Sequence, residues 1–288
     1  MTASISVIVP TWNRAQLLRR TLASVLAQTV APLEVLVADD GSTDDTAAVL
    51  REFGGRVTHL PLPHRGAPAV GRNAALARAR GEWIAFVDDD DLWLPEKLER
   101  QLTLVAPDVG LVCCNAELMG EDDAPLGRCL HEAHPLAKEP DPLRALIGGN
   151  YVVCSSVLAR TALLRATGGF GEEAAVRGIE DYDLWLRCAL RATVRYDHAV
   201  WVRYRVSPHG NLSLSGPPAR NVQRLAAARE RFIAAAGARA QGDLAEPLRQ
   251  NWRRLQHARY KAYLAEGRWG QALAPWVSVQ WAKLRGRR

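Results

Sequence analysis

The sequence contains no long hydrophobic run. None of its 288 residues lies in a stretch approaching the roughly 20 uninterrupted apolar residues that a membrane-spanning helix needs. The first residues, MTASISVIVPTWNR, lack the basic segment of a signal peptide, and their apolar run is short. With 48% hydrophobic and 24% charged residues, the composition is typical of a soluble protein, and we expect a cytoplasmic location.

The cysteines are few and form no metal-binding pattern. The chain has five, none of them in a CxxC pair, and no histidine stands at zinc-finger spacing. Cys113 and Cys114 lie in the apolar run VGLVCCNAEL, which favours buried free thiols over a zinc site. The same interpretation is extended to Cys129, Cys154 and Cys188.

Acidic residues are scarce in the last quarter of the chain. Residues 219–288 hold 15 of the 37 Lys and Arg residues but only 4 of the 31 Asp and Glu residues, a balance of +11. Residues 1–218 therefore carry 22 basic and 27 acidic residues, a balance of −5. The acidic body and the basic tail call for separate explanations.

The first 110 residues alternate short apolar runs with helical patterns. The runs SISVIVP, LEVLVADD, RVTHL and EWIAFV predict strands, and helices of 10–14 residues are predicted between them. This alternation indicates βαβ units and a mostly parallel sheet that binds ligands at the carboxyl ends of its strands. Because no GxGxxG follows any predicted strand, a Rossmann oxidoreductase is excluded.

The pattern changes after about Pro107. VGLVCCNAEL and NYVVCSSVLAR predict strands, joined by a loop at Gly120–Pro142. EDYDLWLRCALRA predicts a strong helix, and TVRYD and AVWVRYRV predict two further strands. Pro217–Pro218 marks a boundary, beyond which the sequence is rich in alanine and arginine and predicts helices alone.

Three acidic groups fall where predicted strands end or helices begin. They are Asp39–Asp40, Asp88–Asp91 and Glu180–Asp181. Acids at a helix start interact favourably with the helix dipole, and this explanation suffices for Asp44 and Asp45.

Four consecutive acids at Asp88–Asp91 exceed what a helix start uses. Neighbouring carboxylates raise each other's pKa values, so either they are solvated or a cation lies among them. Oxygen ligands at a strand end suit Mg²⁺ or Mn²⁺, especially when the ion is shared with substrate phosphates. The residues therefore favour metal binding over solvated acids.

Four motifs carry a resemblance to a known family. SVIVPTWNR, VLVADDGSTDDT, GRNAALARARGEWIAFVDDDDLWLPEKLERQ and EDYDLWLR occur in this order, and together they resemble the family 2 glycosyltransferases. These are inverting enzymes of the GT-A fold that use nucleotide-activated sugars, and the resemblance covers residues 4 to about 215.

The resemblance implies an α/β fold of the GT-A type, a mostly parallel mixed sheet flanked by helices. It places a glycosyltransferase domain at residues 1–216, with a nucleotide-binding half at 1–106 and an acceptor-binding half at 107–216. Residues 217–288 would form an all-helical, basic C-terminal appendage.

The resemblance also implies a nucleotide-sugar site in the first half. Trp12 would stack on the base, unless it packs in the core, while Pro10 and Thr11 would offer backbone contacts. Asp40 would accept the base N–H, which favours uracil or thymine, and Asp39 would bind there or hold the loop. Arg72 would lie near the diphosphate, or else on the surface as a plain charge. The implied nucleotide-sugar-binding residues are Pro10, Thr11, Trp12, Arg14, Asp39, Asp40, Arg72, Asp88 and Asp89.

The DXD motif of the family maps onto Asp88, Asp89 and Asp90, although the extra acid Asp91 leaves its register open by one residue. Asp88 would meet the ribose side and is also a candidate metal ligand, and Asp90 would bind the Mn²⁺ or Mg²⁺ that bridges the two phosphates. His209 is a further candidate near the diphosphate or metal, with an ordinary loop histidine as the alternative.

On the acceptor side, Asp181 aligns with the general base that takes the proton of the acceptor hydroxyl. Glu180 would assist it or bind the acceptor. The alternative for Asp181 is a plain helix cap.

The reaction implied is inverting transfer of a sugar from a UDP- or dTDP-linked donor to a hydroxyl acceptor, a lipid-linked or surface-polysaccharide glycan. A sugar nucleotidyltransferase would need a glycine-rich loop after the first strand, where this chain has PTWNR. A non-catalytic carbohydrate-binding or partner-binding protein on the same scaffold would be expected to lose the DXD acids or the base.

The basic tail permits two interpretations. In EGRWGQALAPWVSVQWAKLRGRR, Trp269, Leu273 and Trp276 fall on one helical side, so residues 266–288 could lie on an anionic membrane at the inner face of the cell. The alternative is a helical hairpin that packs its tryptophans inside. Nucleic acid is not an expected partner, because no recognition motif accompanies the charge.

Overall fold

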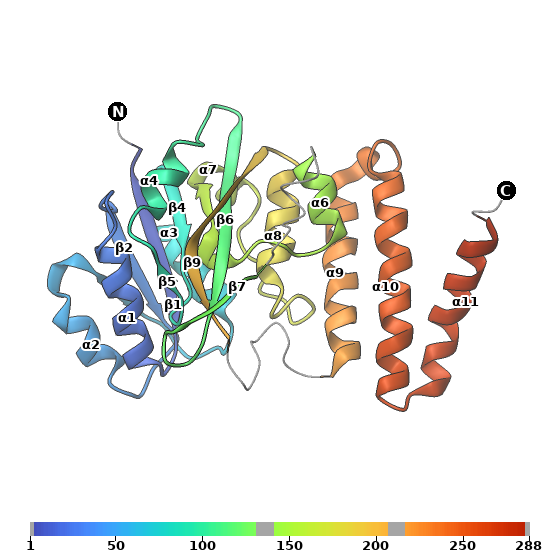
Figure 1. Ribbon diagram of the computed structural model, residues 1–288, viewed down its shortest axis with the longest axis horizontal. Coiled ribbons are helices and arrows are strands. Elements are labelled where there is room, and N and C mark those ends of the chain that lie inside the picture. The colour runs from blue at the N-terminus through green and yellow to red at the C-terminus, as the bar shows by residue number, and fades with distance from the viewer. Residues whose placement is uncertain (1–2, 131–140, 207–216, 286–288) are drawn as a thin grey trace.

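A mixed β-sheet between two layers of helices forms the centre of the protein (Figure 1). The computed structural model describes residues 3–130, 141–206 and 217–285. Within these ranges the strands pair in the order β3-β2-β1-β4-β8-β6-β9-β5, and β7 pairs with β6. The strands are β1 Ile5–Thr11, β2 Glu34–Asp39, β3 Thr58–Pro61, β4 Trp83–Phe86, β5 Leu92–Trp93, β6 Val109–Met119, β7 Pro125–Cys129, β8 Leu158–Arg160 and β9 Thr193–Arg205.

The first four strands are parallel, as the alternating sequence predicted. β1 pairs in parallel with both β2 and β4, and β2 pairs in parallel with β3. The last residues of β1 and β2, Thr11 and Asp39, are register partners. The sheet becomes mixed beyond β4, because β8 runs antiparallel to β4 and β6. The carboxyl ends of the parallel strands thus share one edge, where ligands bind in such sheets.

Side chains that alternate along the strands pack against two different helix layers. On β1, Val7 and Val9 join the cluster that contains residues of α1, α2 and α4. Ile8, which points to the other face, joins the cluster that contains residues of α3, α6, α7, α8 and α9. The helices are α1 Ala15–Leu26, α2 Thr46–Glu52, α3 Pro68–Arg78, α4 Lys97–Leu102, α6 Pro142–Gly148, α7 Thr161–Ala166, α8 Glu180–Ala189, α9 Pro218–Ala236, α10 Ala245–Ala265 and α11 Trp269–Arg285, with 3₁₀ helices η1 Gly54–Arg56, η2 Cys154–Ser156 and η4 Gly237–Ala240.

The second half departs from the sequence prediction in three places. The expected loop at 120–142 contains strand β7, which forms a hairpin with β6. The run NYVVCSSVLAR supplies only the short strand β8, because its preceding residues form η2, where the Ser155 hydroxyl bonds the neighbouring acid loop. The two strands expected at 193–206 are one strand, β9, with an irregularity where Cys114 pairs with Asp197 and Asn115 with Val200.

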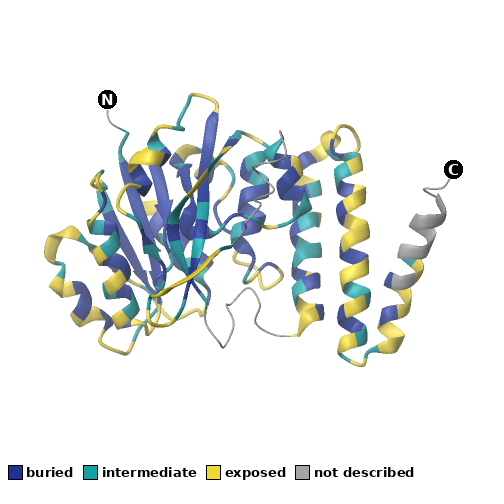
Figure 2. Ribbon diagram, viewed as in Figure 1, coloured by how far each residue is buried: buried dark blue, intermediate teal, exposed yellow. Residues whose placement is uncertain are grey.

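Within residues 217–285 the chain forms helices joined by short turns, as predicted, and Pro218 occupies the first turn of α9. Ala228 and Phe232 of α9 belong to the same hydrophobic cluster as Trp185 of α8. Buried residues fill the sheet and the helices beside it, whereas buried and exposed residues alternate along α10 (Figure 2). No helix in the described ranges is long and apolar enough to cross a bilayer.

The prediction of free thiols is confirmed. Cys113, Cys114, Cys154 and Cys188 are buried free cysteines, and Cys129 is a half-buried one.

Candidate active site

The turn after β1 is fastened to the turn after β2. Asn13 adopts a positive φ of 51°. Its side-chain oxygen accepts hydrogen bonds from the backbone N–H groups of Thr43 (2.7 Å) and Asp44 (3.3 Å). Asp44 in turn accepts from the N–H groups of Ala15 and Thr46, which open α1 and α2. The helix-start role expected for Asp44 is therefore filled at two helices at once.

Asp39 and Asp40 both hold loops at the sheet edge. Buried Asp39 accepts a hydrogen bond from the Ser42 N–H at 2.9 Å and contacts a ring nitrogen of His59 at 3.0 Å. The two carboxylate oxygens of Asp40 accept from the N–H groups of Arg65 and Gly66, each at 2.7 Å. Any bond from Asp40 to a nucleobase would have to use a remaining lone pair of these oxygens.

Trp12 does not pack in the core. Its side chain is 48% exposed and stacks on His64, with ring centroids 4.6 Å apart and planes inclined by 25°. His64 belongs to the loop that Asp40 holds, and its Nδ1 lies 2.9 Å from the Asp40 carbonyl oxygen. An exposed aromatic ring held against a second ring at the sheet edge offers a face on which a planar base can stack.

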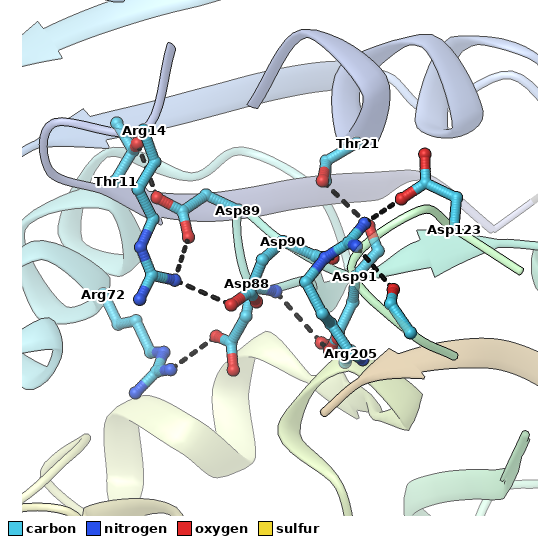
Figure 3. A network of polar contacts seen from close by, with 12 residues as sticks. Thr11, Arg14, Thr21, Arg72, Asp88, Asp89, Asp90, Asp91, Asp123 and Arg205 are labelled. Carbon is cyan, nitrogen blue, oxygen red and sulfur yellow. Dashed lines mark hydrogen bonds and ion pairs between the residues drawn. The ribbon is translucent and has the colours of Figure 1, made fainter. Parts of the chain in front are cut away.

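The four acids after β4 divide into two kinds (Figure 3). Asp89 and Asp91 are buried, with 5% and 1% of their surfaces exposed. The side chains of Asp88 and Asp90 are 31% and 26% exposed. The alternating pattern turns one pair of carboxylates inward and leaves the other pair accessible.

Asp89 fixes the first strand to the acid loop. Its carboxylate accepts a hydrogen bond from the Thr11 hydroxyl at 2.7 Å and contacts Arg14 at 3.2 Å. Burial raises the pKa of Asp89 to about 7, and the charge of Arg14 opposes this shift. Arg14 also contacts Asp90 at 2.7 Å, so one half-exposed cation serves both acids. Thr11 and Asp89 thus act here as supports of the loop.

Asp91 is held from two sides by hydrogen bonds. The Ser155 hydroxyl donates to one carboxylate oxygen at 2.5 Å, and the Arg205 backbone N–H donates to the other at 2.9 Å. Burial, together with the charges of Asp90 and Asp88, raises the pKa of Asp91 well above its usual range. Ser155 also accepts from the backbone N–H of Asp88 at 3.0 Å, which ties both ends of the acid run to η2.

Arg205, at the end of β9, closes the loop from the opposite side. Its buried guanidinium donates to the carbonyl oxygen of Asp90 at 2.9 Å and to that of Gly120 at 2.8 Å. The same group pairs with Asp123, whose second oxygen pairs with Arg20 at 2.7 Å. The hairpin of β6 and β7 is thereby joined to the acids (Figure 3).

Arg72 links the acid loop to α8. This arginine is 5% exposed, so it is not the surface charge considered as the alternative. One terminal nitrogen lies 2.6 Å from Asp88 and the other 3.0 Å from Glu180. The second oxygen of Glu180 accepts from the Gly178 N–H at 2.6 Å. Arg72 therefore connects α3, the acid loop after β4 and the start of α8, which are far apart in the sequence.

Asp181 follows Glu180 on α8 and is half-buried. Burial and the charge of Glu180 raise its pKa to about 7, whereas Arg72 lowers it and Asp88 adds to the rise. One carboxylate oxygen accepts from the Tyr182 N–H at 2.7 Å. A carboxylate with a pKa near neutrality is suited to accept a proton at physiological pH.

Asp88 and Asp90 have the chemistry of a divalent-cation site. Each is bound by an arginine through one oxygen, and burial and Asp88 raise the pKa of Asp90. The described residues contain no group of three His, Cys, Asp or Glu side chains that could hold a metal. A cation would therefore have two carboxylate ligands and need further oxygens from substrate phosphates, as Mg²⁺ often does. His209 lies outside the described residues.

Several residues of the site were missed by sequence reasoning. Ser155, Arg205 and His64 each contact an acid or a ring of the site. For Arg205 the available signal was a charged residue within an otherwise strand-like run, RYRV, and for Ser155 it was a serine pair in an apolar run. For His64 it was a Pro- and Gly-containing segment, PLPHRG, directly after a strand.

Comparison with known proteins decides the family. The sequence profile of glycosyl transferase family 2 matches residues 6–165, more than half of the chain. The chain belongs to glycosyltransferase family 2. The family resemblance seen in the motifs is confirmed.

Three curated relatives of this family 2 chain illustrate the similarity. An uncharacterized glycosyltransferase of Rickettsia prowazekii, RP339, is 27% identical over 212 residues, which cover 70% of this chain and 64% of the relative. The putative teichuronic acid biosynthesis glycosyltransferase TuaG of Bacillus subtilis is 33% identical over 148 residues, 50% of this chain and 59% of TuaG. The Escherichia coli WfgD, a UDP-Glc:alpha-D-GlcNAc-diphosphoundecaprenol beta-1,3-glucosyltransferase, is 39% identical over 102 residues, 35% of this chain and 40% of WfgD. The family 2 chain thus spans less than two thirds of each.

Solved structures confirm the fold. The mannosyltransferase PcManGT from Pyrobaculum calidifontis, in complex with GDP-Man and Mn²⁺, superimposes with a TM-score of 0.67 at 22% identity, covering 98% of this chain and 76% of PcManGT. TarS 1-349 of S. aureus, in complex with UDP-GlcNAc, gives 0.65 at 19% identity, covering 98% of this chain and 92% of TarS 1-349. The family 2 chain therefore has the expected GT-A-type fold.

Proposed function

We propose that this family 2 chain transfers a sugar, with inversion, from a nucleoside diphosphate sugar to a hydroxyl group of a glycan acceptor. The observation that carries the proposal is the bridge from Asp88 through Arg72 to Glu180. It joins Asp88, one of the two accessible acids, to the residue that precedes the half-buried Asp181 on α8. A donor phosphate site and a proton acceptor are the two parts that direct displacement at a sugar carbon needs.

On the donor side, Trp12 and His64 offer an aromatic surface for the base, and Asp88, Asp90 and their arginines face the diphosphate. A divalent cation held by Asp88 and Asp90 would stabilise negative charge on the departing diphosphate as a Lewis acid. PcManGT, which has a similar fold, forms a complex with GDP-Man and Mn²⁺, and this supports a divalent cation at the donor site. Uracil or thymine remains our prediction for the base, supported by the UDP-GlcNAc of the TarS complex.

On the acceptor side, Asp181 takes the proton of the attacking hydroxyl. The hydroxyl oxygen then bonds to the anomeric carbon on the face opposite the diphosphate, whose bond to that carbon breaks with its electron pair. A pKa of about 7 allows Asp181 to hold this proton once transfer is complete. Glu180, occupied by Arg72 and the Gly178 N–H, keeps α8 in position rather than acting as a second base.

The acceptor is proposed to be a lipid-linked or surface-polysaccharide glycan. The names of TuaG and WfgD, which refer to teichuronic acid and to a diphosphoundecaprenol substrate, support this class. Exposed apolar residues on α11 fit the same setting: Trp269, Leu273 and Val277 are 70%, 62% and 38% exposed. With the basic balance of residues 219–288, they suit peripheral contact with an anionic bilayer at the inner face of the cell membrane.

Thermal-shift measurements with UDP, dTDP and GDP, each with and without Mn²⁺, test the donor assignment. A ligand present at a hundredfold excess over its Kd stabilises the folded state by about 2.7 kcal/mol. We expect the pyrimidine nucleotides to raise the melting temperature, and Mn²⁺ to increase the effect. A chain that responds to none of the three nucleotides is not the proposed transferase.

A further inference from the structure

Three arginines interact with one another near Glu180, the first residue of α8. Arg177 is exposed and lies in the segment that leads into α8. Arg220 and Arg224 lie in the first two turns of α9, four residues apart and therefore on one face of the helix. Arg220 is exposed, whereas Arg224 is buried, with 9% of its surface exposed.

In the part of the chain that the structure describes, no ion pair neutralises the charges of this arginine cluster, Arg177, Arg220 and Arg224. Within residues 3–130, 141–206 and 217–285, none of the three forms an ion pair. Arg224 donates one hydrogen bond to the Asn221 side chain at 3.1 Å, and its buried Nε has no hydrogen-bond partner in those ranges. A buried polar group without a partner is costly and is rare in native proteins.

Glu180, the acid whose charge acts on Arg224, already has partners for its carboxylate. Glu180 raises the pKa of Arg224, but burial, followed by Arg220 and Arg177, lowers it. Both oxygens of Glu180 are occupied, by Arg72 and by the Gly178 N–H. An anion placed among the three arginines would satisfy the guanidinium and remove the mutual repulsion.

The arginine cluster is fixed to the helix that carries the candidate base. The helices α8 and α9 lie side by side (Figure 1). Asp183 of α8 joins them, since it pairs with Arg231 of α9 at 2.8 Å and with Arg187 of its own helix at 2.7 Å. The cluster therefore keeps its place relative to Asp181, two residues before Asp183.

We propose that Arg177, Arg220 and Arg224 bind a phosphate group of the acceptor substrate next to Asp181. Planar guanidinium groups pair with phosphate oxygens in a bidentate manner, so a phosphate ester fits the cluster better than a neutral sugar does. The donor diphosphate is assigned to a different set of residues, Asp88, Asp90 and Arg72. This inference rests on the proposed function, because it assumes that α8 faces an acceptor.

Glycerol 3-phosphate serves as the probe, with glycerol as its uncharged control. Its binding is measured by calorimetry on the full chain saturated with Mn²⁺ and with the nucleotide that gives the largest thermal shift. The variant R177A/R220A removes two exposed charges and leaves the core intact. R249A/R253A removes the same charge from exposed positions on α10 and is the matched control.

We expect R177A/R220A to weaken glycerol 3-phosphate binding by about tenfold or more, since charged hydrogen bonds are lost. Nucleotide affinity stays unchanged, and R249A/R253A behaves as the wild type. R224Q also weakens binding, R224K restores part of it, and circular dichroism verifies that both are folded. The proposal is overturned if R177A/R220A binds the probe normally, or if it loses nucleotide affinity to the same extent, which would assign the cluster to the donor.

The wild type separates this inference from the proposed function. A chain that binds no nucleotide contradicts the transferase assignment itself. A chain that binds nucleotide with Mn²⁺ but not glycerol 3-phosphate contradicts the phosphate subsite alone.

Discussion

Arg72 holds Asp88 and Glu180 to the same guanidinium group, at 2.6 Å and 3.0 Å. Asp88 follows strand β4, and Glu180 is the first residue of helix α8. The phenyl ring of Phe170 lies 5.3 Å from the same guanidinium. The buried guanidinium of Arg72 thus holds the acid loop after β4 and the start of α8 together.

Replacement of Arg72 by alanine should destabilise the fold and abolish transfer. Loss of one partner from a buried ion pair typically costs about 3–5 kcal/mol, because the other charge is left unpaired. We expect urea unfolding of R72A to show a loss of this order. The double variant R72A/E180Q should regain much of the stability but none of the activity. Equal instability of the single and double variants would show that Glu180 is not the residue that Arg72 compensates.

Asp90 and Asp91 should give opposite results when each is replaced by alanine. D90A removes an accessible, repelled carboxylate, so it should unfold near the wild-type temperature yet lose Mn²⁺-dependent nucleotide binding and nearly all transfer. D91A leaves the Ser155 hydroxyl and the Arg205 N–H without an acceptor and should cost about 1–3 kcal/mol of stability. Calorimetric unfolding with and without UDP and Mn²⁺ separates the two. If D90A retains normal turnover, its assignment as a metal ligand is wrong.

Transfer should depend on the ionisation of Asp181. Its pKa is raised to about 7, so kcat/KM should rise with pH through that value and level off above it. The folded state binds this proton more tightly than the unfolded state does, so Asp181 lowers the free energy of unfolding as pH increases from its ordinary pKa to about 7.

The variant D181N tests both consequences. It should nearly abolish transfer while melting above the wild type at pH 8, and the difference in melting temperature should shrink towards pH 5. A flat pH–rate profile with normal turnover of D181N would remove Asp181 from the role of base.

Replacement of Trp12 by alanine should weaken nucleotide binding without weakening the fold. A base stacked on an aromatic ring contributes about 1–3 kcal/mol, so Kd for the nucleotide should rise by roughly 5- to 150-fold. The side chain is 48% exposed, and the melting temperature should therefore change little. W12F is the control, since it retains an aromatic face. An unchanged Kd in W12A would place the base elsewhere.

Contact of α11 with a bilayer can be measured by flotation. We expect the full chain to float with liposomes that contain anionic phospholipid, and less with purely zwitterionic ones. W269S/L273S replaces two exposed apolar residues and should stay in the bottom fraction. Because both side chains are exposed, nucleotide-induced thermal shifts should be unaffected. Equal flotation of the variant would exclude this face of α11.

The sequence predicted β1 to β4 and α1 to α3 in their order, because these strands are bounded by turn residues and all but the mostly exposed β3 are buried. It also placed the acids correctly at strand ends and helix starts. The two-residue strand β5 was missed. Strand β7 was missed, since its residues are mostly exposed and show no alternation. Helices α4, α6 and α7 are six or seven residues long, too short to display helical periodicity.

The partners within the site could not be predicted from local patterns. Four consecutive aspartates, Asp88–Asp91, gave no means of predicting which of their side chains are buried. That division depends on Thr11 for Asp89 and on Ser155 and Arg205 for Asp91, all of which come from distant parts of the chain. The pairing of Arg72 with Glu180 is of the same kind, because it exists only once α3 and α8 pack on one face of the sheet.

Helix α9 places Ala228 and Phe232 in the main core while it presents Arg220 and Arg224 beside α8. On the proposed assignment, this nineteen-residue helix would contribute both to acceptor binding and to the stability of the fold. Replacing α9 with the same helix of another family member would change part of the hydrophobic core together with these cations. Such a chimera would fold only if the introduced helix packed against the Trp185 side of α8.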